Sequence, residues 1–128
     1  MARAYTVATI ALALNVPVKW VDNVLSHFEI SGVHQGTQGA VRRIGSSGVM
    51  ELGVIKDLVD GLRLPLQRAL PVARALISNG RLEAGEQLVV VLDQEALWVT
   101  LSSRLEFAIE VAPLPRRGRP PGKAKRGA

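Results

Sequence analysis

The chain has 128 residues, which fits one domain or one compact domain with a small appendage, and 48% of its residues are hydrophobic, enough for a core. It contains no cysteine, which excludes disulfide bonds and thiolate metal sites. Its apolar runs fall short of the roughly 18 residues that a membrane helix needs, and helical periodicity explains the apolar residues after Arg3 better than a secretory signal does. We therefore expect a cytoplasmic protein with no membrane contact.

Positive charge is concentrated at the C-terminus. The formal net charge is +5, and residues 113–128 hold six of the sixteen lysines and arginines and no acid. Ten cations then remain against eleven acids, so residues 1–112 carry a net charge of −1. The folded part is therefore not a general binder of polyanions, and non-specific attraction to nucleic acid belongs to the C-terminal segment.

Residues 6–28 have the pattern of two short helices joined by a tight turn. Thr6 is a candidate N-cap for the first helix. The apolar residues after it share one helical face: Val7, Ile10, Ala11 and Leu14. Asn15 tolerates a left-handed backbone, and Pro17 suits the start of a second helix. The expected inward face of that helix consists of Val18, Val21, Leu25 and Phe28.

The outward face of the second helix carries Lys19, Asn23 and Ser26. A cation and an amide on a short exposed helix are the chemistry that a recognition helix presents to the major groove. An ordinary helical hairpin with a solvated face is the alternative interpretation.

The residues after the second helix favour DNA binding. Two extended runs, 31–35 and 40–44, are joined by a four-residue loop that holds two glycines and Gln38, and such a loop suits a β-hairpin. A hairpin placed directly after a helix-turn-helix is a wing. Its arginines, Arg42 and Arg43, would lie beside the phosphate backbone.

Helical periodicity then returns twice. Residues 46–60 are expected to form a helix capped by Ser46 or Ser47, whose inward residues are Val49, Leu52, Ile55, Val59 and Leu62. A further helix is expected over residues 65–78, with a kink or break at Pro71. Asn79-Gly80 is a typical helix stop.

Residues 86–112 are expected to be extended. The run 88–92 is continuously aliphatic, residues 93–95 form a turn, residues 96–101 resume the extended pattern, and residues 104–111 alternate strictly between large apolar and other side chains. Three adjacent strands would form a small antiparallel β meander. Its apolar face needs a partner surface, because so small a sheet is not stable alone.

The order of these elements resembles the DNA-binding domain of the MerR family of bacterial regulators, over roughly Tyr5–Ser78. The residues that carry the resemblance are Tyr5-Thr6-Val7, Ala11, Val16-Pro17-Val18, Lys19, Gly39 and Arg43-Ile44. It implies that Lys19 and Asn23 on the recognition helix, together with the two wing arginines, contact DNA. Family members usually dimerise through a long C-terminal helix, which we do not find in the sequence. We therefore expect the meander to form a homodimer interface or, alternatively, to capture another protein along an edge strand.

The C-terminal residues 113–128 are expected to be disordered, because they combine closely spaced prolines, glycines and like charges. Their centre, Arg117-Gly118-Arg119-Pro120, resembles the core of an AT-hook. An extended Arg-Gly-Arg segment is thin enough to enter a narrow A·T minor groove. The expected DNA contacts here are Arg116, Arg117, Arg119 and Lys123. Non-specific attraction to phosphates and a purely solubilising role are the alternatives.

Other chemistry is sparse. His27 and His34 have no carboxylate at metal-ligand spacing, so we expect a phosphate contact or a polar surface from them, and no metal or other cofactor. Trp20 is a further candidate at the DNA interface, although packing beneath the wing is its preferred role. Ser46 and Ser47 lack a paired His and Asp nearby, so no enzymatic activity is expected.

The sequence thus predicts an α+β fold in three parts: a winged helix-turn-helix in residues 1–80, a β-strand dimerisation or partner-binding segment in residues 81–112, and a disordered basic tail in residues 113–128. The expected function is sequence-specific binding of double-stranded DNA by a homodimeric, nucleoid-associated transcriptional regulator. One alternative is the DNA-binding antitoxin of a toxin–antitoxin pair, whose residues 88–111 would hold the toxin. The other is an architectural protein that selects only A·T richness.

Overall fold

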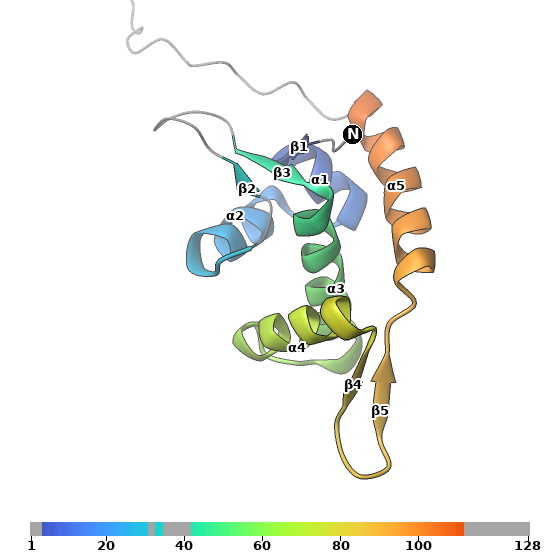
Figure 1. Ribbon diagram of the computed structural model, residues 1–128. Helices are drawn as coiled ribbons and strands as arrows, with labels where there is room; N and C mark the ends of the chain where they lie inside the picture. Colours follow the sequence, from blue (N-terminus) through green and yellow to red (C-terminus); the bar gives the residue numbers. More distant parts are fainter. Residues whose placement is uncertain (1–3, 31–32, 35–41, 112–128) are drawn as a thin grey trace, which may run out of the picture.

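The computed structural model describes residues 4–30, 33–34 and 42–111. They form an α+β fold, as the sequence predicts, with helices around one core and a small antiparallel sheet toward either end of the view (Figure 1). In chain order the elements are β1 (Ala4–Thr6), α1 (Val7–Leu14), α2 (Val18–His27), β2 (Val33–His34), β3 (Arg43–Gly45), α3 (Ser46–Leu62), α4 (Leu66–Asn79), β4 (Arg81–Glu83), β5 (Val89–Val91) and α5 (Gln94–Val111).

The first two helices and the turn between them form as predicted. The hydroxyl oxygen of Thr6 accepts a hydrogen bond from the backbone N–H of Thr9 at 3.3 Å, which caps α1. Asn15 ends α1 in the left-handed region, at φ 59°, and the N–H of Val16 donates back into the last turn of the helix. Pro17 follows with φ −67° and precedes α2. Local sequence therefore determines the turn that sets α2 against α1.

The inward face of α2 is shifted from the predicted one. Val21 and Val24 are buried, and Leu25 and Phe28 pack partly against the core. Val18, predicted to face inward, is 46% exposed. The prediction was wrong at this residue because α2 meets the core after its first turn, so the start of the helix is left in solvent.

The predicted hairpin is part of a three-stranded antiparallel sheet in the order β1-β3-β2. In the central strand β3, Ile44 lies opposite Tyr5 of β1 on one side and opposite Val33 of β2 on the other. The loop of the hairpin, including Gln38, lies outside the described residues. Strand β1 was missed, because three residues are too few for a periodic pattern to appear.

Helices α3 and α4 match the two later helical predictions, with three differences. Gly45 occupies the N-cap position of α3, and neither predicted serine does. Leu62, expected to face inward, is exposed at the last turn of α3. The prediction at Pro71 was a kink or a break, and no break occurs: helix α4 continues through the proline, since buried residues on both sides of it hold the helix to the core. Gly80 ends α4 at φ 77°, as expected.

The predicted β meander is wrong over most of its length. Residues 94–111 form helix α5, so the strands expected over residues 96–101 and 104–111 do not exist. Only the first predicted strand is present, as β5. It pairs with β4, a strand that the sequence did not reveal, with Val90 opposite Leu82. A two-stranded hairpin and a helix therefore replace the three strands.

Helix α5 carries helical signals that the alternating pattern concealed. The carboxylate of Asp93 accepts a hydrogen bond from the N–H of Ala96 at 3.0 Å, in the manner of an N-cap. The buried residues of the helix repeat at the helical spacing: Leu101, Leu105 and Ala108. Phe107 and Ile109, which a strand would bury on the same face as Leu105, are exposed. The alternation of apolar residues over 104–111 therefore does not mark which side chains are buried.

Helix α5 packs along α1 and also contacts α3, closing one side of the core (Figure 1). The side-chain amide of Gln94 donates to the carbonyl oxygen of Ile77 at 2.7 Å, which ties the start of α5 to the end of α4. A long C-terminal helix is thus present, contrary to the sequence-based expectation. Its buried face is covered by helices of the same chain, so residues 94–111 share a core with the two N-terminal helices.

Candidate nucleic-acid interface

Helix α2 has one polar face in solvent. Lys19, Asp22, Asn23 and Ser26 are all exposed, and their spacing places them along a single side of the helix. We call these four residues the α2 face. It brings together the predicted contacts Lys19 and Asn23. It also includes Asp22, which sequence reasoning missed although its helical spacing from Lys19 could have revealed it.

Trp20 lies between the α2 face and the core. Its side chain is partly buried and packs against the core cluster. Packing against the core is thus shown, and packing beneath the wing stays a prediction. A ring held in this way fixes the orientation of α2 and so of the neighbouring Lys19.

An ion pair joins the α2 face to the edge of the sheet. Arg42, which directly precedes β3, places its Nη1 3.8 Å from Oδ1 of Asp22. Both side chains are partly exposed, so the pair contributes at most about 1 kcal/mol to stability. The pair matters for geometry and charge, because it shows that the start of β3 lies beside the α2 face. It also sets a cation beside an acid that would otherwise repel phosphate.

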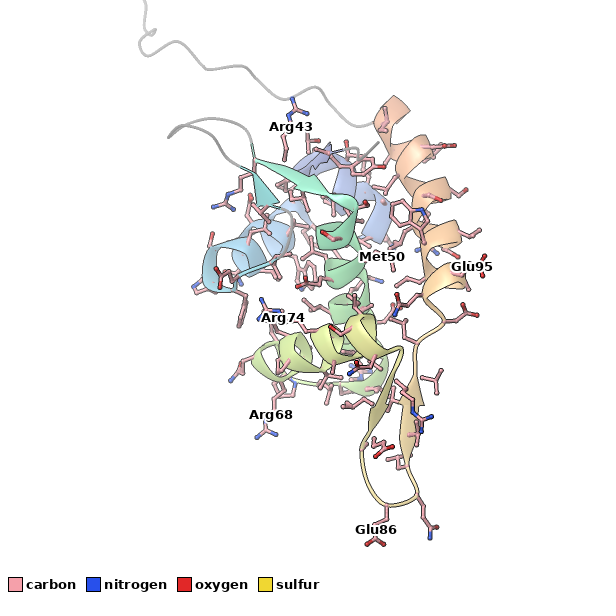
Figure 2. The ribbon with its side chains drawn as sticks, in the orientation of Figure 1. Arg43, Met50, Arg68, Arg74, Glu86 and Glu95 are labelled. Carbon is pink, nitrogen blue, oxygen red and sulfur yellow. The ribbon has the colours of Figure 1, made fainter. Side chains whose placement is uncertain are left out.

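Arg43 is the next residue and is exposed. Successive strand residues point to opposite faces, so Arg43 and Arg42 diverge from one another. The backbone of Arg43 is paired with Thr6 of β1 and with His34 of β2, which fixes its position on both sides. Figure 2 shows Arg43 at the end of the molecule where the three-stranded sheet lies. No described residue forms an ion pair with it, so its charge is available to a ligand.

His27 follows the α2 face at the last turn of the helix. Its Nδ1–H donates to the backbone carbonyl oxygen of Asn23 at 2.9 Å. In a neutral ring the remaining Nε2 is then an acceptor, and a phosphate oxygen requires a donor. The predicted phosphate contact by His27 is consistent with this arrangement only when the ring is protonated. The side chain of His34 lies outside the described residues.

Arg74 fixes the position of the segment that follows α2. Its Nη2 donates to the backbone carbonyl oxygen of Glu29, and its Nε lies 3.7 Å from Oε1 of Glu51, a buried residue of α3. Arg74, labelled in Figure 2, therefore links α3, α4 and the segment that follows α2. Sequence reasoning missed this link, since Arg74 and Glu29 are 45 residues apart.

The remaining predicted contacts are outside the described residues: Gln38, Arg116, Arg117, Arg119 and Lys123. Within the described part of the chain, no group of three or more His, Asp or Glu side chains is placed to hold a metal ion. The helices found there are also too short or too polar to span a bilayer.

The candidate interface thus combines one lysine, one amide and one hydroxyl on a helix with two arginines at a neighbouring strand. Such a set can donate hydrogen bonds to base edges and to phosphate oxygens. No protein-family model, curated protein or solved structure matches this chain. The function is therefore inferred from the chemistry of these residues.

Proposed function

We propose that this protein binds double-stranded DNA with sequence preference and regulates transcription. The observation that carries the proposal is the ion pair between Arg42 and Asp22, which shows that the start of β3 lies beside the α2 face. In a winged helix-turn-helix these two elements contact DNA together, the helix in the major groove and the wing on the backbone. The order of α1, α2, hairpin, α3 and α4 also supports the resemblance to the MerR family.

Each residue has a distinct role in this proposal. Lys19 and Asn23 contact base edges, since lysine donates well to guanine and the asparagine amide forms two hydrogen bonds with adenine. Arg43 contacts phosphate, which fixes the orientation of the protein on the duplex. Arg42 offsets the charge of Asp22, so that the acid on the α2 face does not oppose binding.

Substitution of Lys19 tests the proposal. Lys19→Ala is expected to weaken binding to a duplex from the protein's own upstream region about tenfold, since a base contact contributes about 1–3 kcal/mol. Binding to a scrambled duplex should change little. Fluorescence anisotropy with labelled duplexes measures both. Arg68→Ala is the matched control, because it removes the same charge from an exposed position of α4 and should leave both affinities unchanged (Figure 2).

Two results would contradict sequence-specific binding through α2. If Lys19→Ala lowers the affinity for both duplexes equally, Lys19 contacts phosphate and not a base edge. A native protein that binds both duplexes equally, and prefers only A·T-rich DNA, would support the architectural alternative instead.

We also propose that the protein acts as a homodimer that contacts two half-sites about one helical turn apart. The exposed apolar residues of the β4–β5 hairpin support this, since Val89 and Val91 face solvent and Val91 is 72% exposed. Analytical ultracentrifugation should find a dimer for the native chain and a monomer for Val91→Glu. A native monomer at concentrations that saturate DNA would refute the dimer.

The same exposed valines favour one second candidate, the antitoxin. An antitoxin would use this apolar surface to bind its toxin rather than a second copy of itself. A native monomer that forms a complex with a small protein encoded beside it, and loses that complex on Val91→Glu, would support this candidate.

A further inference from the structure

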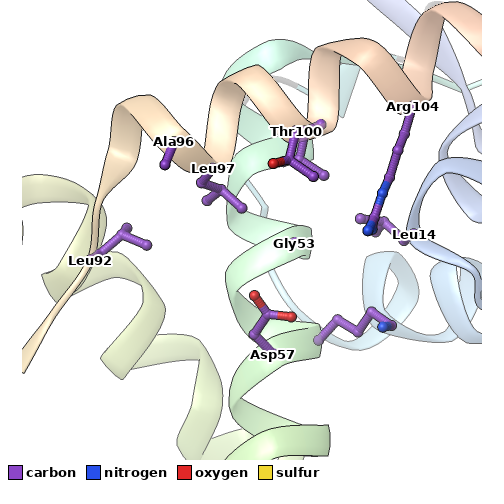
Figure 3. Close-up of a pocket in the computed structure, with 10 residues that line it drawn as sticks. Leu14, Gly53, Asp57, Leu92, Ala96, Leu97, Thr100 and Arg104 are labelled. Atoms are coloured by element: carbon purple, nitrogen blue, oxygen red, sulfur yellow. The ribbon is translucent and has the colours of Figure 1, made fainter.

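A cleft of about 350 Å³ opens between α1, α3 and α5 (Figure 3). Leu14 comes from α1, Gly53 and Lys56 come from α3, and Thr100 and Arg104 come from α5. None of these residues belongs to the α2 face. The volume falls within the range of about 300–1,000 Å³ that small-molecule sites occupy.

Two cationic side chains, Lys56 and Arg104, lie on the same side of this cleft. Lys56 and Arg104 also line an adjoining hollow of about 500 Å³, together with the amide of Asn15 and the hydroxyl of Ser103. Figure 3 shows the Arg104 side chain extending from α5 toward Leu14. The Nζ of Lys56 lies 3.6 Å from Oδ2 of Asp60. No described residue forms an ion pair with Arg104, so an anion bound here would interact with its guanidinium group.

Much of the remaining wall of the cleft is apolar. Leu14 and Leu101 are almost fully buried, and Leu97 packs partly against the core beside them. Gly53 brings α3 and α5 close together here, because a Cβ at this position would lie only 3.1 Å from Cδ1 of Leu101. The missing side chain of Gly53 therefore lets Leu101 of α5 pack directly against the backbone of α3, and glycine backbone and leucines together form this wall of the cleft.

We propose that this cleft binds a small free organic carboxylate with an apolar body. The acid lies between Lys56 and Arg104, and the apolar body covers Gly53 and the leucines. Figure 3 shows the carboxylate of Asp57 apart from the tip of Arg104, and because it would repel an acid placed beside it, the acid is better placed near Arg104. The site goes beyond DNA binding and does not depend on it.

Phenylbutyrate, a carboxylate with an apolar ring, is a suitable probe. Titrated into the isotope-labelled full chain, it should produce saturable shifts in the amide signals of Leu14, Gly53 and Thr100, and none on the α2 face. Phenylbutanol has the same body without the acid, and it should bind about tenfold more weakly because it lacks the charge-assisted hydrogen bonds. Inorganic phosphate should also bind weakly, since it lacks the apolar body.

Variants test the two halves of the site separately. Arg104→Gln should weaken phenylbutyrate binding about tenfold, whereas Arg68→Gln, an exposed arginine of α4, should not change it. Thr100→Phe should block the cleft without altering a buried residue. Amide spectra of the variants without ligand verify that each is folded.

Three results would overturn the proposal. These are the absence of saturable shifts in the native chain, equal binding of phenylbutanol or phosphate, and unchanged binding by both Arg104→Gln and Thr100→Phe. No DNA is present in these titrations, so failure here and failure of the proposed DNA binding are separate outcomes.

Discussion

The carboxylate of Glu51 is a buried charge, and Arg74 of α4 lies beside it. Its side chain is 6% exposed, and Oε1 lies 3.7 Å from Nε of Arg74. Arg74 itself is about half exposed, so solvent screens part of the attraction. Removing one partner of a buried charge nevertheless costs more than breaking a surface pair, because the other charge stays out of water.

Arg74→Met is therefore expected to lower the free energy of unfolding by about 1–3 kcal/mol. Methionine keeps much of the alkyl packing but removes the cation near Glu51 and the hydrogen bond to Glu29. Adding Glu51→Gln should restore part of the loss, since the buried carboxylate is then neutral. Urea unfolding measures each value.

Arg68→Met is the control for this experiment, because Arg68 is an exposed arginine on the same helix. Its substitution should change stability by less than about 0.5 kcal/mol. If Arg74→Met behaves like the control, the link between α3, α4 and the segment that follows α2 contributes nothing to stability.

Single residues were predictable where the signal is local. Thr6, Asn15 and Gly80 each act on backbone atoms within a few residues, so their cap and turn roles were visible in the sequence. The pair of Arg42 with Asp22 joins residues 20 positions apart and depends on how the hairpin folds back onto α2. Residue spacing in the sequence therefore does not predict this ion pair.

Helix α5 shows how an element can be predicted wrongly when apolar residues are taken for buried ones. Leu105, Phe107 and Ile109 alternate as in a strand, but only Leu105 is inside. The packing of α5 on α1 and α3 determines which side chains are buried, and that packing joins distant parts of the chain. The acidic cap at Asp93 was the local signal that favoured a helix.

A pair of substitutions in α5 distinguishes the helix from a strand. Leu105→Ala is expected to lower the free energy of unfolding by about 2–4 kcal/mol, because Leu105 is 1% exposed and its loss leaves a cavity. Phe107→Ala should change it by less than about 0.5 kcal/mol, because Phe107 is 67% exposed. Thermal and urea unfolding measure both. A strand would bury the two side chains on one face, so comparable losses would contradict the helix.

At the scale of the whole molecule, the excess positive charge lies outside the part of the chain that the structure describes. Residues 1–112, which include every described residue, carry a net charge of −1, and the α2 face itself holds one lysine and one acid. The six lysines and arginines of residues 113–128 hold the excess positive charge. In the proposed function, base contacts and non-specific attraction to phosphate therefore come from different parts of the chain. Composition alone predicts this division, whereas the placement of the base contacts requires the fold.

Replacing the six C-terminal lysines and arginines with glutamine tests that division. The slope of log affinity against log salt should flatten by up to about 5 units, at about 0.9 for each phosphate that is no longer neutralised. The preference for the upstream duplex over a scrambled one should persist, because Lys19 and Asn23 are unchanged. Anisotropy titrations over a salt series measure both quantities. An unchanged slope would assign the phosphate contacts to the folded residues, Arg43 among them. If the preference disappears with the charge, the C-terminal segment distinguishes sequences and α2 does not.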